Sequence, residues 1–289
     1  MIDWPEEVVT DIARRRCVLF LGAGVSKNST NDQGVRPADW LEFLQGLAND
    51  IDGEERAAVD QCIANGDLLT ACEVARDALR VAAFESRLLA AFSEKRFRPS
   101  PVHTDLVEID SRIVLTTNFD KIYENAANSI LHGDILVKTY LSEDLADIIR
   151  RQNRCILKVH GSIDSPREAI LTRTDYARMR SKHADFYRIL DALFMTHTFV
   201  FLGASMTDPD VRLLLEDYAR RYPGTRPHYV VSPAGATPAP IVKVIESSMN
   251  LRTISYNPQD NHRELSEGIA QLKNLVNESR SGLLTTMNW

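Results

Sequence analysis

The sequence predicts an α/β fold in which helices cover both faces of one parallel sheet. Two observations predict it. Short apolar runs alternate along the chain with stretches of helical periodicity, which is the pattern of βαβ units. The first apolar run, 17–21, ends in Gly22-Ala23-Gly24, the kind of tight turn that follows the first strand of a Rossmann-like sheet. The predicted strands are 17–21, 113–117, 135–140, 155–159, 199–202, 228–231 and 251–256.

Helical segments fill most of the space between these strands. Pro5 suits the first turn of a helix over 5–16. Residues 54–98 are dominated by Ala, Leu, Glu and Arg and carry no strand signal, so we expect a helical insert there. Further helices are predicted at 38–50, 185–196, 209–221 and 260–278, and 27–37 is predicted to be a polar loop beside the glycine turn. We therefore predict one domain over 1–278, with its insert at about 54–98, and a C-terminal tail over 279–289.

Composition excludes several classes of protein. The chain has 289 residues, of which 44% are hydrophobic and 26% are charged, and this suits one large α/β domain. Its net charge of -6 gives no general attraction to nucleic acid. No apolar run approaches the ~20 residues that span a bilayer, and the acidic N-terminus lacks the features of a signal peptide. The 4 cysteines form no C-x-x-C pair. We expect a cytoplasmic protein without a metal site.

Polar or glycine-rich motifs follow four of the predicted strands. They are Gly22-Ala23-Gly24-Val25-Ser26, Thr117-Asn118-Phe119-Asp120, His160-Gly161 and Gly203-Ala204-Ser205. The carboxyl ends of parallel strands share one edge of a sheet, and ligands bind in the crevice at that edge. The four motifs therefore predict one pocket, in which the glycine turn lets backbone N–H groups approach a pyrophosphate.

The residue types in this predicted pocket suit chemistry on a nucleotide. Asn118 can hold a ribose hydroxyl or orient a water molecule. The imidazole of His160 can accept a proton and so can act as a general base. Asp120 can bind a ribose hydroxyl or an amide, or it can cap the helix that follows. For Asp208, which precedes Pro209, we expect a helix cap first.

The order of these motifs resembles that of the sirtuin family, and the resemblance covers about residues 15–278. It implies binding of NAD+ as a substrate and cleavage of the bond between nicotinamide and ribose. It also implies that Asn118 and His160 are catalytic. The binding residues it implies are Gly22, Ala23, Gly24, Ser26, Thr117, Asp120, Gly203 and Ser205.

The chain departs from the sirtuin deacylases in two respects. It has no pair of C-x-x-C motifs for a zinc module, and it reads Thr-Asn-Phe-Asp where deacylases usually have Gln-Asn-Ile-Asp. This pattern resembles the zinc-less sirtuin-like domains of bacterial antiphage systems. The resemblance implies an NAD+ hydrolase, without a metal, that acts as a homo-oligomer or with a second defence protein. That partner would be an Argonaute-like sensor or a hexameric ATPase, and we expect it to be a separate chain, because this one ends close to the end of the resemblance.

Two other functions remain open from the sequence. One is an NAD-dependent protein deacylase or ADP-ribosyltransferase, against which the missing cysteine pairs argue. The other is a non-catalytic module that binds NAD or ADP-ribose and assembles with a partner. The presence of both Asn118 and His160 argues against it, because a site that only binds does not need both.

Overall fold

A parallel sheet of seven strands forms the centre of the computed structural model, which describes residues 1–286. The strands are β1 (Cys17–Leu21), β2 (Ile113–Thr116), β3 (Leu136–Thr139), β4 (Cys155–Lys158), β5 (Thr198–Leu202), β6 (His228–Pro233) and β7 (Leu251–Tyr256). Their order is β3-β4-β2-β1-β5-β6-β7, and every neighbouring pair is parallel. The predicted α/β class is confirmed, and each predicted strand is present. The order reverses beside β1, so the crevice of this sheet opens between the carboxyl ends of β1 and β5.

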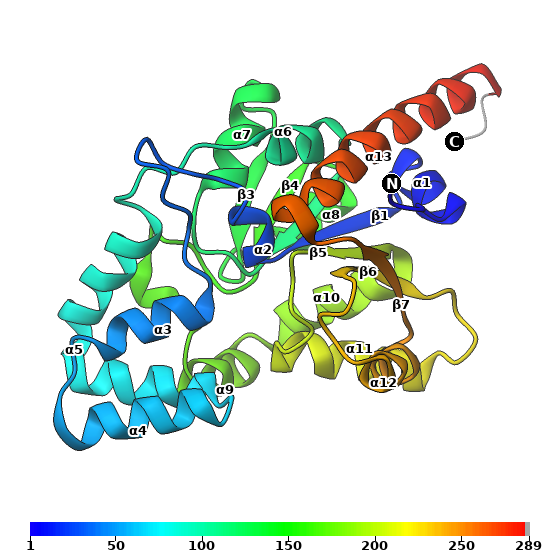
Figure 1. Ribbon diagram of the computed structural model, residues 1–289. Helices are drawn as coiled ribbons and strands as arrows, with labels where there is room; N and C mark the ends of the chain where they lie inside the picture. Colours follow the sequence, from blue (N-terminus) through cyan, green and yellow to red (C-terminus); the bar gives the residue numbers. More distant parts are fainter. Residues whose placement is uncertain (287–289) are drawn as a thin grey trace.

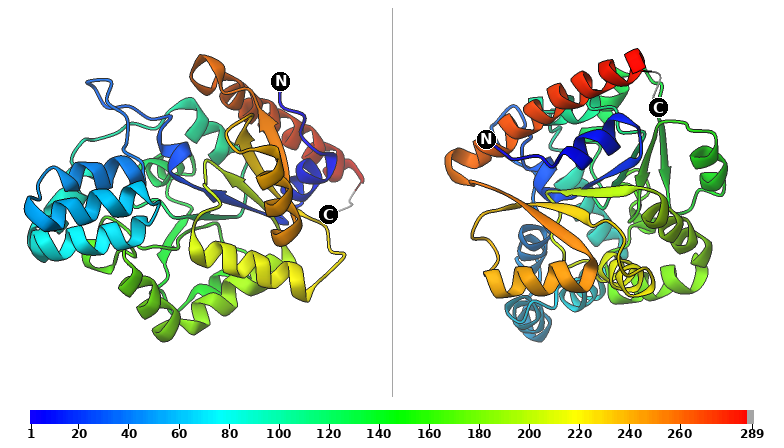
Figure 2. Two further views of the ribbon diagram at one scale, coloured as in Figure 1. Left: turned by 60° about the horizontal axis from the view of Figure 1, so that its bottom comes forward. Right: turned by 90° about the vertical axis from the view of Figure 1, so that its right-hand side faces the viewer.

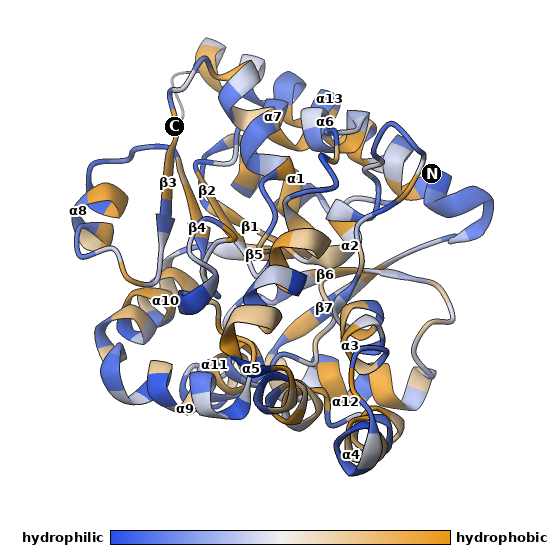
Figure 3. Ribbon diagram, turned by 90° about the vertical axis from the view of Figure 1, so that its left-hand side faces the viewer, coloured by the Kyte–Doolittle hydropathy of each residue, from blue (hydrophilic) through white to orange (hydrophobic). Residues whose placement is uncertain are grey.

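Helices cover both faces of the sheet, as predicted (Figures 1 and 3). One face carries α1 (Glu6–Ala13), α6 (Pro101–Glu108), α7 (Ile122–Ile130) and α13 (Gln259–Thr286). The other carries α8 (Leu145–Arg150), α9 (Arg173–Lys182), α10 (Ala184–Thr196), α11 (Pro209–Arg221) and α12 (Ala239–Met249). Side chains alternate between the two faces along each strand, so Leu19 and Leu21 join the first core while Val18 and Phe20 join the second.

The predicted helical insert forms a separate group of helices beside the sheet (Figure 2). In the stretch predicted as the insert, 54–98, the helices are α4 (Gly53–Ala64) and α5 (Leu68–Phe92), and residues 93–98 are not helical. The helix predicted separately at 38–50 is α3 (Trp40–Ala48), and the three helices together form this group. Its core includes Phe43 and Leu88, and it also takes in Phe119 from the loop after β2 and Ile163 from the loop after β4. The insert therefore packs directly against two of the loops that carry site residues.

The structure contains more helix than the sequence analysis predicted. α6, α8, α9 and α12 had no predicted counterpart. In α9 the reason is clear, because its strongly polar sequence shows no apolar periodicity. α13 continues to Thr286, so residues 279–286 of the predicted tail belong to this helix, and 287–289 lie outside the described residues. Within 1–286, no helix has the length and apolar character needed to cross a membrane.

Candidate active site

Two strand-end loops pack backbone against backbone at the switch point of the sheet. After β1, Gly22 N donates to Leu202 O over 2.9 Å and Gly24 N donates to Gly203 O over 2.9 Å. A Cβ on Gly22 would lie 2.4 Å from Gly203 O, and one on Gly203, where φ is +60°, would lie 2.5 Å from Val25 N. The glycines therefore have a structural reason beyond the predicted approach of a ligand, namely contact between the two loops.

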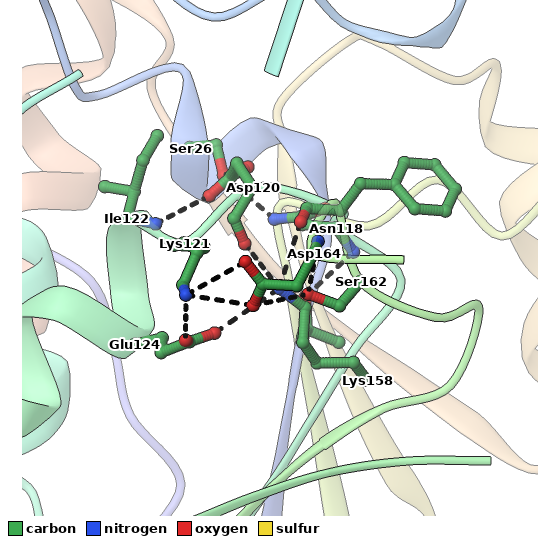
Figure 4. A network of polar contacts seen from close by, with 11 residues as sticks. Ser26, Asn118, Asp120, Lys121, Ile122, Glu124, Lys158, Ser162 and Asp164 are labelled. Carbon is green, nitrogen blue, oxygen red and sulfur yellow. Dashed lines mark hydrogen bonds and ion pairs between the residues drawn. The ribbon is translucent and has the colours of Figure 1, made fainter. Parts of the chain in front are cut away.

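Asn118 is fixed against the glycine turn by its amide nitrogen. Its Nδ2 donates to Gly22 O over 2.9 Å and to Ser26 Oγ over 3.0 Å (Figure 4). Because a carbonyl oxygen only accepts, the amide nitrogen must face Gly22. Asn118 Oδ1 has no hydrogen-bond partner within residues 1–286. The side chain is half-buried, so this oxygen is an acceptor held in place at the carboxyl edge of the sheet.

Thr116, at the end of β2, shapes the loop that carries Asn118. Its Oγ1 donates to Leu21 O over 2.8 Å and accepts from Asn118 N over 3.0 Å. The sequence analysis missed this residue and singled out Thr117 instead. Thr117 is half-buried, and no hydrogen bond of its side chain is present in the described part of the chain. The available signal was a hydroxyl residue closing an otherwise apolar strand.

Asp120 is buried and joins the same group (Figure 4). Its Oδ2 accepts from Ser26 Oγ over 2.7 Å, and its Oδ1 accepts from Ile122 N over 2.9 Å at the start of α7. Asp120 thus binds the first N–H of α7, which is close to the capping role that the sequence left open, although the residue directly before this helix is Lys121. Ser26 connects Asp120 to Asn118, so the loops after β1 and β2 form one hydrogen-bonded unit.

Lys158, at the end of β4, binds the backbone of this hydrogen-bonded unit. Its side chain is 1% exposed, and Nζ donates to Phe119 O over 3.0 Å and to Asp120 O over 2.6 Å (Figure 4). Burial lowers the pKa of its ammonium group, while Glu124, 3.5 Å away, favours the charged form. The sequence analysis did not identify Lys158, although a lysine at the end of a buried apolar strand was the signal.

His160 lies beyond Lys158, in the loop after β4. Its Nε2 is 3.2 Å from Asp208 Oδ2 and 3.3 Å from the hydroxyl oxygen of Tyr176. That hydroxyl donates to Asp208 Oδ2 over 2.7 Å. Gly161 follows with φ +89°, and a Cβ there would lie 2.8 Å from Glu168 O. The sequence analysis did not identify Tyr176, and it expected Asp208 to act first as a helix cap.

The structure brings the four predicted motifs to one edge of the sheet. Ile163 N donates to Phe119 O over 3.0 Å, which joins the loops after β4 and β2. Asp208, in the loop after β5, joins that loop to His160. Within the described chain, Asn118 and His160 share no hydrogen bond. Ala23 lies half-buried in the glycine turn, while Ser205 is exposed and its Oγ lies 2.8 Å from Thr207 Oγ1. No group of three or more metal-ligating side chains is present among residues 1–286.

A protein-family model matches the part of the chain that forms most of this edge of the sheet. The SIR2-like domain family matches residues 112–254, which hold β2 to β6 and the first part of β7, and therefore Asn118, His160 and Asp208. This match covers just under half of the chain. β1 with its glycine turn and the helical insert lie outside the matched region.

Curated proteins that are similar to this chain come from bacteria. NAD(+) hydrolase ThsA of Acinetobacter baumannii is 25% identical over 78% of this chain and 44% of its own length. NAD(+) hydrolase ThsA of Bacillus cereus is 22% identical over 94% of this chain and 56% of its own length. Defense-associated sirtuin 2 of Bacillus subtilis is 24% identical over 74% of this chain and 20% of its own length. The chain thus spans about half the length of the first two relatives.

Proposed function

We propose that this chain hydrolyses NAD+ to nicotinamide and ADP-ribose. The observation that carries the proposal is Asn118, whose amide is held by Gly22 and Ser26 so that Oδ1 is left as a fixed acceptor at the crevice. His160, a group able to take a proton, lies on the loop after the neighbouring strand. The names of the ThsA relatives support the same substrate.

In the proposed reaction, the bond between C1′ of the ribose and the nicotinamide nitrogen breaks. Its electron pair stays with the nitrogen, so nicotinamide leaves as a neutral molecule and the ribose becomes cationic. A water molecule held by Asn118 Oδ1 adds to C1′, and its proton passes to His160 and then to solvent. The products are nicotinamide, ADP-ribose and one proton. A fixed acceptor near C1′ favours the cationic ribose, because its dipole is already oriented before the charge develops.

The biological role we propose is that of an effector in antiphage defence, controlled by self-assembly or by a partner such as an ATPase or Argonaute-like sensor. The name of the Bacillus subtilis relative supports the defence role. An enzyme that destroys NAD+ must stay inactive until it is needed, which is the reason to expect control.

The test is a chromatographic time course of NAD+ with the purified chain, the Asn118→Ala variant and the Asn250→Ala variant. Asn250 has φ +49° at the end of α12, and its side chain donates to Thr225 and Arg226, neither of which is a site residue, so its change lowers stability by about 1 kcal/mol or more and leaves the site unchanged. We expect Asn118→Ala to lower the rate at least about 100-fold with a fall in melting temperature similar to that of Asn250→Ala, because each change removes side-chain hydrogen bonds. We expect Asn250→Ala to keep the rate. Equal rates for Asn118→Ala and the parent chain would contradict the proposal.

A further inference from the structure

Three side chains from three separate segments meet behind the proposed site. His160 comes from the loop after β4, Tyr176 from α9, and Asp208 from the residue before α11. Their side chains are almost enclosed, with 9% of His160 and 16% of Asp208 exposed. Asp208 Oδ2 is the shared acceptor, since it lies 2.7 Å from the Tyr176 hydroxyl and 3.2 Å from His160 Nε2.

These contacts determine which nitrogen of His160 carries the proton. A carboxylate only accepts hydrogen bonds, so Asp208 requires a proton on Nε2. The Tyr176 hydroxyl gives its own proton to Asp208 and therefore offers only lone pairs to Nε2. Burial first, and then the charge of Asp208, raise the pKa of Tyr176 well above its ordinary value, so the hydroxyl keeps that proton at neutral pH. Both partners of Nε2 are therefore acceptors.

We propose that Asp208 is a positioning residue that holds neutral His160 with its proton on Nε2, which leaves Nδ1 as the base. Nδ1 has no hydrogen-bond partner within residues 1–286, so its lone pair is available. This inference rests on the proposed function in one respect, namely that the proton taken by Nδ1 comes from the water that attacks NAD+. The tautomer itself follows from the three side chains. Among histidine bases, a buried carboxylate on the far nitrogen is the arrangement that fixes both tautomer and ring orientation.

Asp208 is itself held by the start of α11. Its Oδ1 accepts from Asp210 N over 3.1 Å and from Val211 N over 2.9 Å. The capping role expected from the sequence is therefore present, and it leaves only Oδ2 to face His160. Two backbone donors thus fix the carboxylate, so its position does not depend on the histidine.

This geometry makes Asp208→Asn an informative change. The two backbone N–H groups need an acceptor, so the new amide oxygen must take the place of Oδ1, and the amide nitrogen must face His160. An amide nitrogen donates, so Nε2 has to accept, and the proton moves to Nδ1. The variant keeps the helix cap and loses the base.

The first measurement is the histidine tautomer, read from the ring nitrogens of ¹⁵N-histidine-labelled chain by NMR, with His160→Gln to assign the signals. We expect Nε2 to be protonated and Nδ1 to be bare in the parent chain, and the reverse in Asp208→Asn. A parent chain with its proton on Nδ1 would overturn the proposal. This readout needs no NAD+, so it can succeed even where the proposed hydrolase activity fails.

The second measurement is the steady-state rate against pH for the parent chain, Asp208→Asn and Asp210→Asn. Asp210 is the matched control, because it is a buried carboxylate on the same helix that pairs with Arg180 and Tyr187 and makes no hydrogen bond to His160. We expect Asp208→Asn to lower kcat by about 10² to 10⁴-fold with KM little changed, and Asp210→Asn to keep kcat within about threefold. Asp208, Tyr176 and, farther away, the Asp210–Arg180 pair and Tyr187 are the titratable and charged groups around the ring. Equal losses in the two variants would show that Asp208 acts only through stability, and would overturn the proposal.

Discussion

The buried residue His103 makes the stability of the fold depend on pH. It is 0% exposed, and its Nδ1 accepts from Ser100 N over 3.1 Å, which closes a capping box at the start of α6. Its Nε2 has no partner among the described residues. Burial lowers the pKa of the imidazole to about 4, because a charged ring cannot be solvated there. His103 therefore stays neutral in the folded protein where the unfolded chain, with a pKa near 6.5, takes up a proton.

This difference predicts a loss of stability in acid. Above pH 6.5 His103 is neutral in both states and costs nothing. As the pH falls from 6.5 to about 4, only the unfolded state binds the proton, so the free energy of unfolding falls by about 2–3 kcal/mol from this group. His103→Gln should remove that slope while keeping the capping box, since glutamine at this position accepts from the cap backbone. Urea unfolding at pH 7 and pH 5 measures both. An unchanged slope in the variant would contradict the account.

At the scale of the elements, contact between the loops after β1 and β5 holds the site together. Gly203 has φ +60° and nearly touches Gly24 and Val25, so it combines an unusual backbone conformation with a lack of space. Gly224, between α11 and β6, has φ +86° and open space where its Cβ would be. Substitutions at Gly203 and Gly224 therefore distinguish the effect of a positive φ, which both residues have, from the lack of space for a Cβ, which only Gly203 has.

We expect Gly224→Ala to lower the free energy of unfolding by about 1 kcal/mol, which is the backbone effect alone. Gly203→Ala should cost about 3 kcal/mol or more, because backbone atoms cannot move aside as side chains do. It should also lower the NAD+ hydrolysis rate measured well below the melting temperature, since the loops after β1 and β5 would separate. Similar losses of stability and no loss of rate would mean that contact between the loops does not matter.

Most of the strands and the edge of the sheet that carries the site could be predicted from the sequence, because each feature is local. An apolar run that ends in a glycine or polar motif identifies a strand and its carboxyl end together. The contact of His160 with Asp208 could not be predicted in this way. It depends on how α9 and α11 pack beneath the sheet, and α9 is too polar to show a period. The residues at the strand ends stay predicted site residues until they are tested by substitution.

At the scale of the whole molecule, α13 connects the two ends of the chain. The indole of Trp4 donates to Gly268 O over 2.9 Å, and a Cβ at Gly268 would lie 2.5 Å from Ile2, so the N-terminal segment lies in a notch on this helix. Lys273 pairs with Asp105 and so joins α13 to α6. The helix therefore covers one face of the sheet and fastens the first residues of the chain to it (Figure 1).

The last turns of α13, which lie in the segment predicted as a tail, also contact the N-terminal part of the chain. Arg280 donates to Ile12 O over 3.3 Å, to Ala13 O over 3.3 Å and to Asp110 O over 3.1 Å. Ile12 and Ala13 end α1, and Ile12 O also accepts from Arg15 N over 2.9 Å, so Arg280 adds further donors to the last carbonyls of this helix. Leu283, 9% exposed, belongs to the same core as α1. These contacts indicate that 279–286 stabilise the fold, whereas the sequence analysis predicted only a tail there.

Removing residues 279–289 should therefore lower the free energy of unfolding by about 3 kcal/mol or more, from the burial of Leu283 and the charged hydrogen bonds of Arg280. Arg280→Met, which keeps the length and apolar stem of the side chain, should account for about 1–3 kcal/mol of it. Denaturant unfolding measures these values, and light scattering on the same samples measures assembly. A truncated chain with unchanged stability but a different assembly state would favour the role in assembly, because residues that only mediate contact between copies add nothing to the fold of one copy.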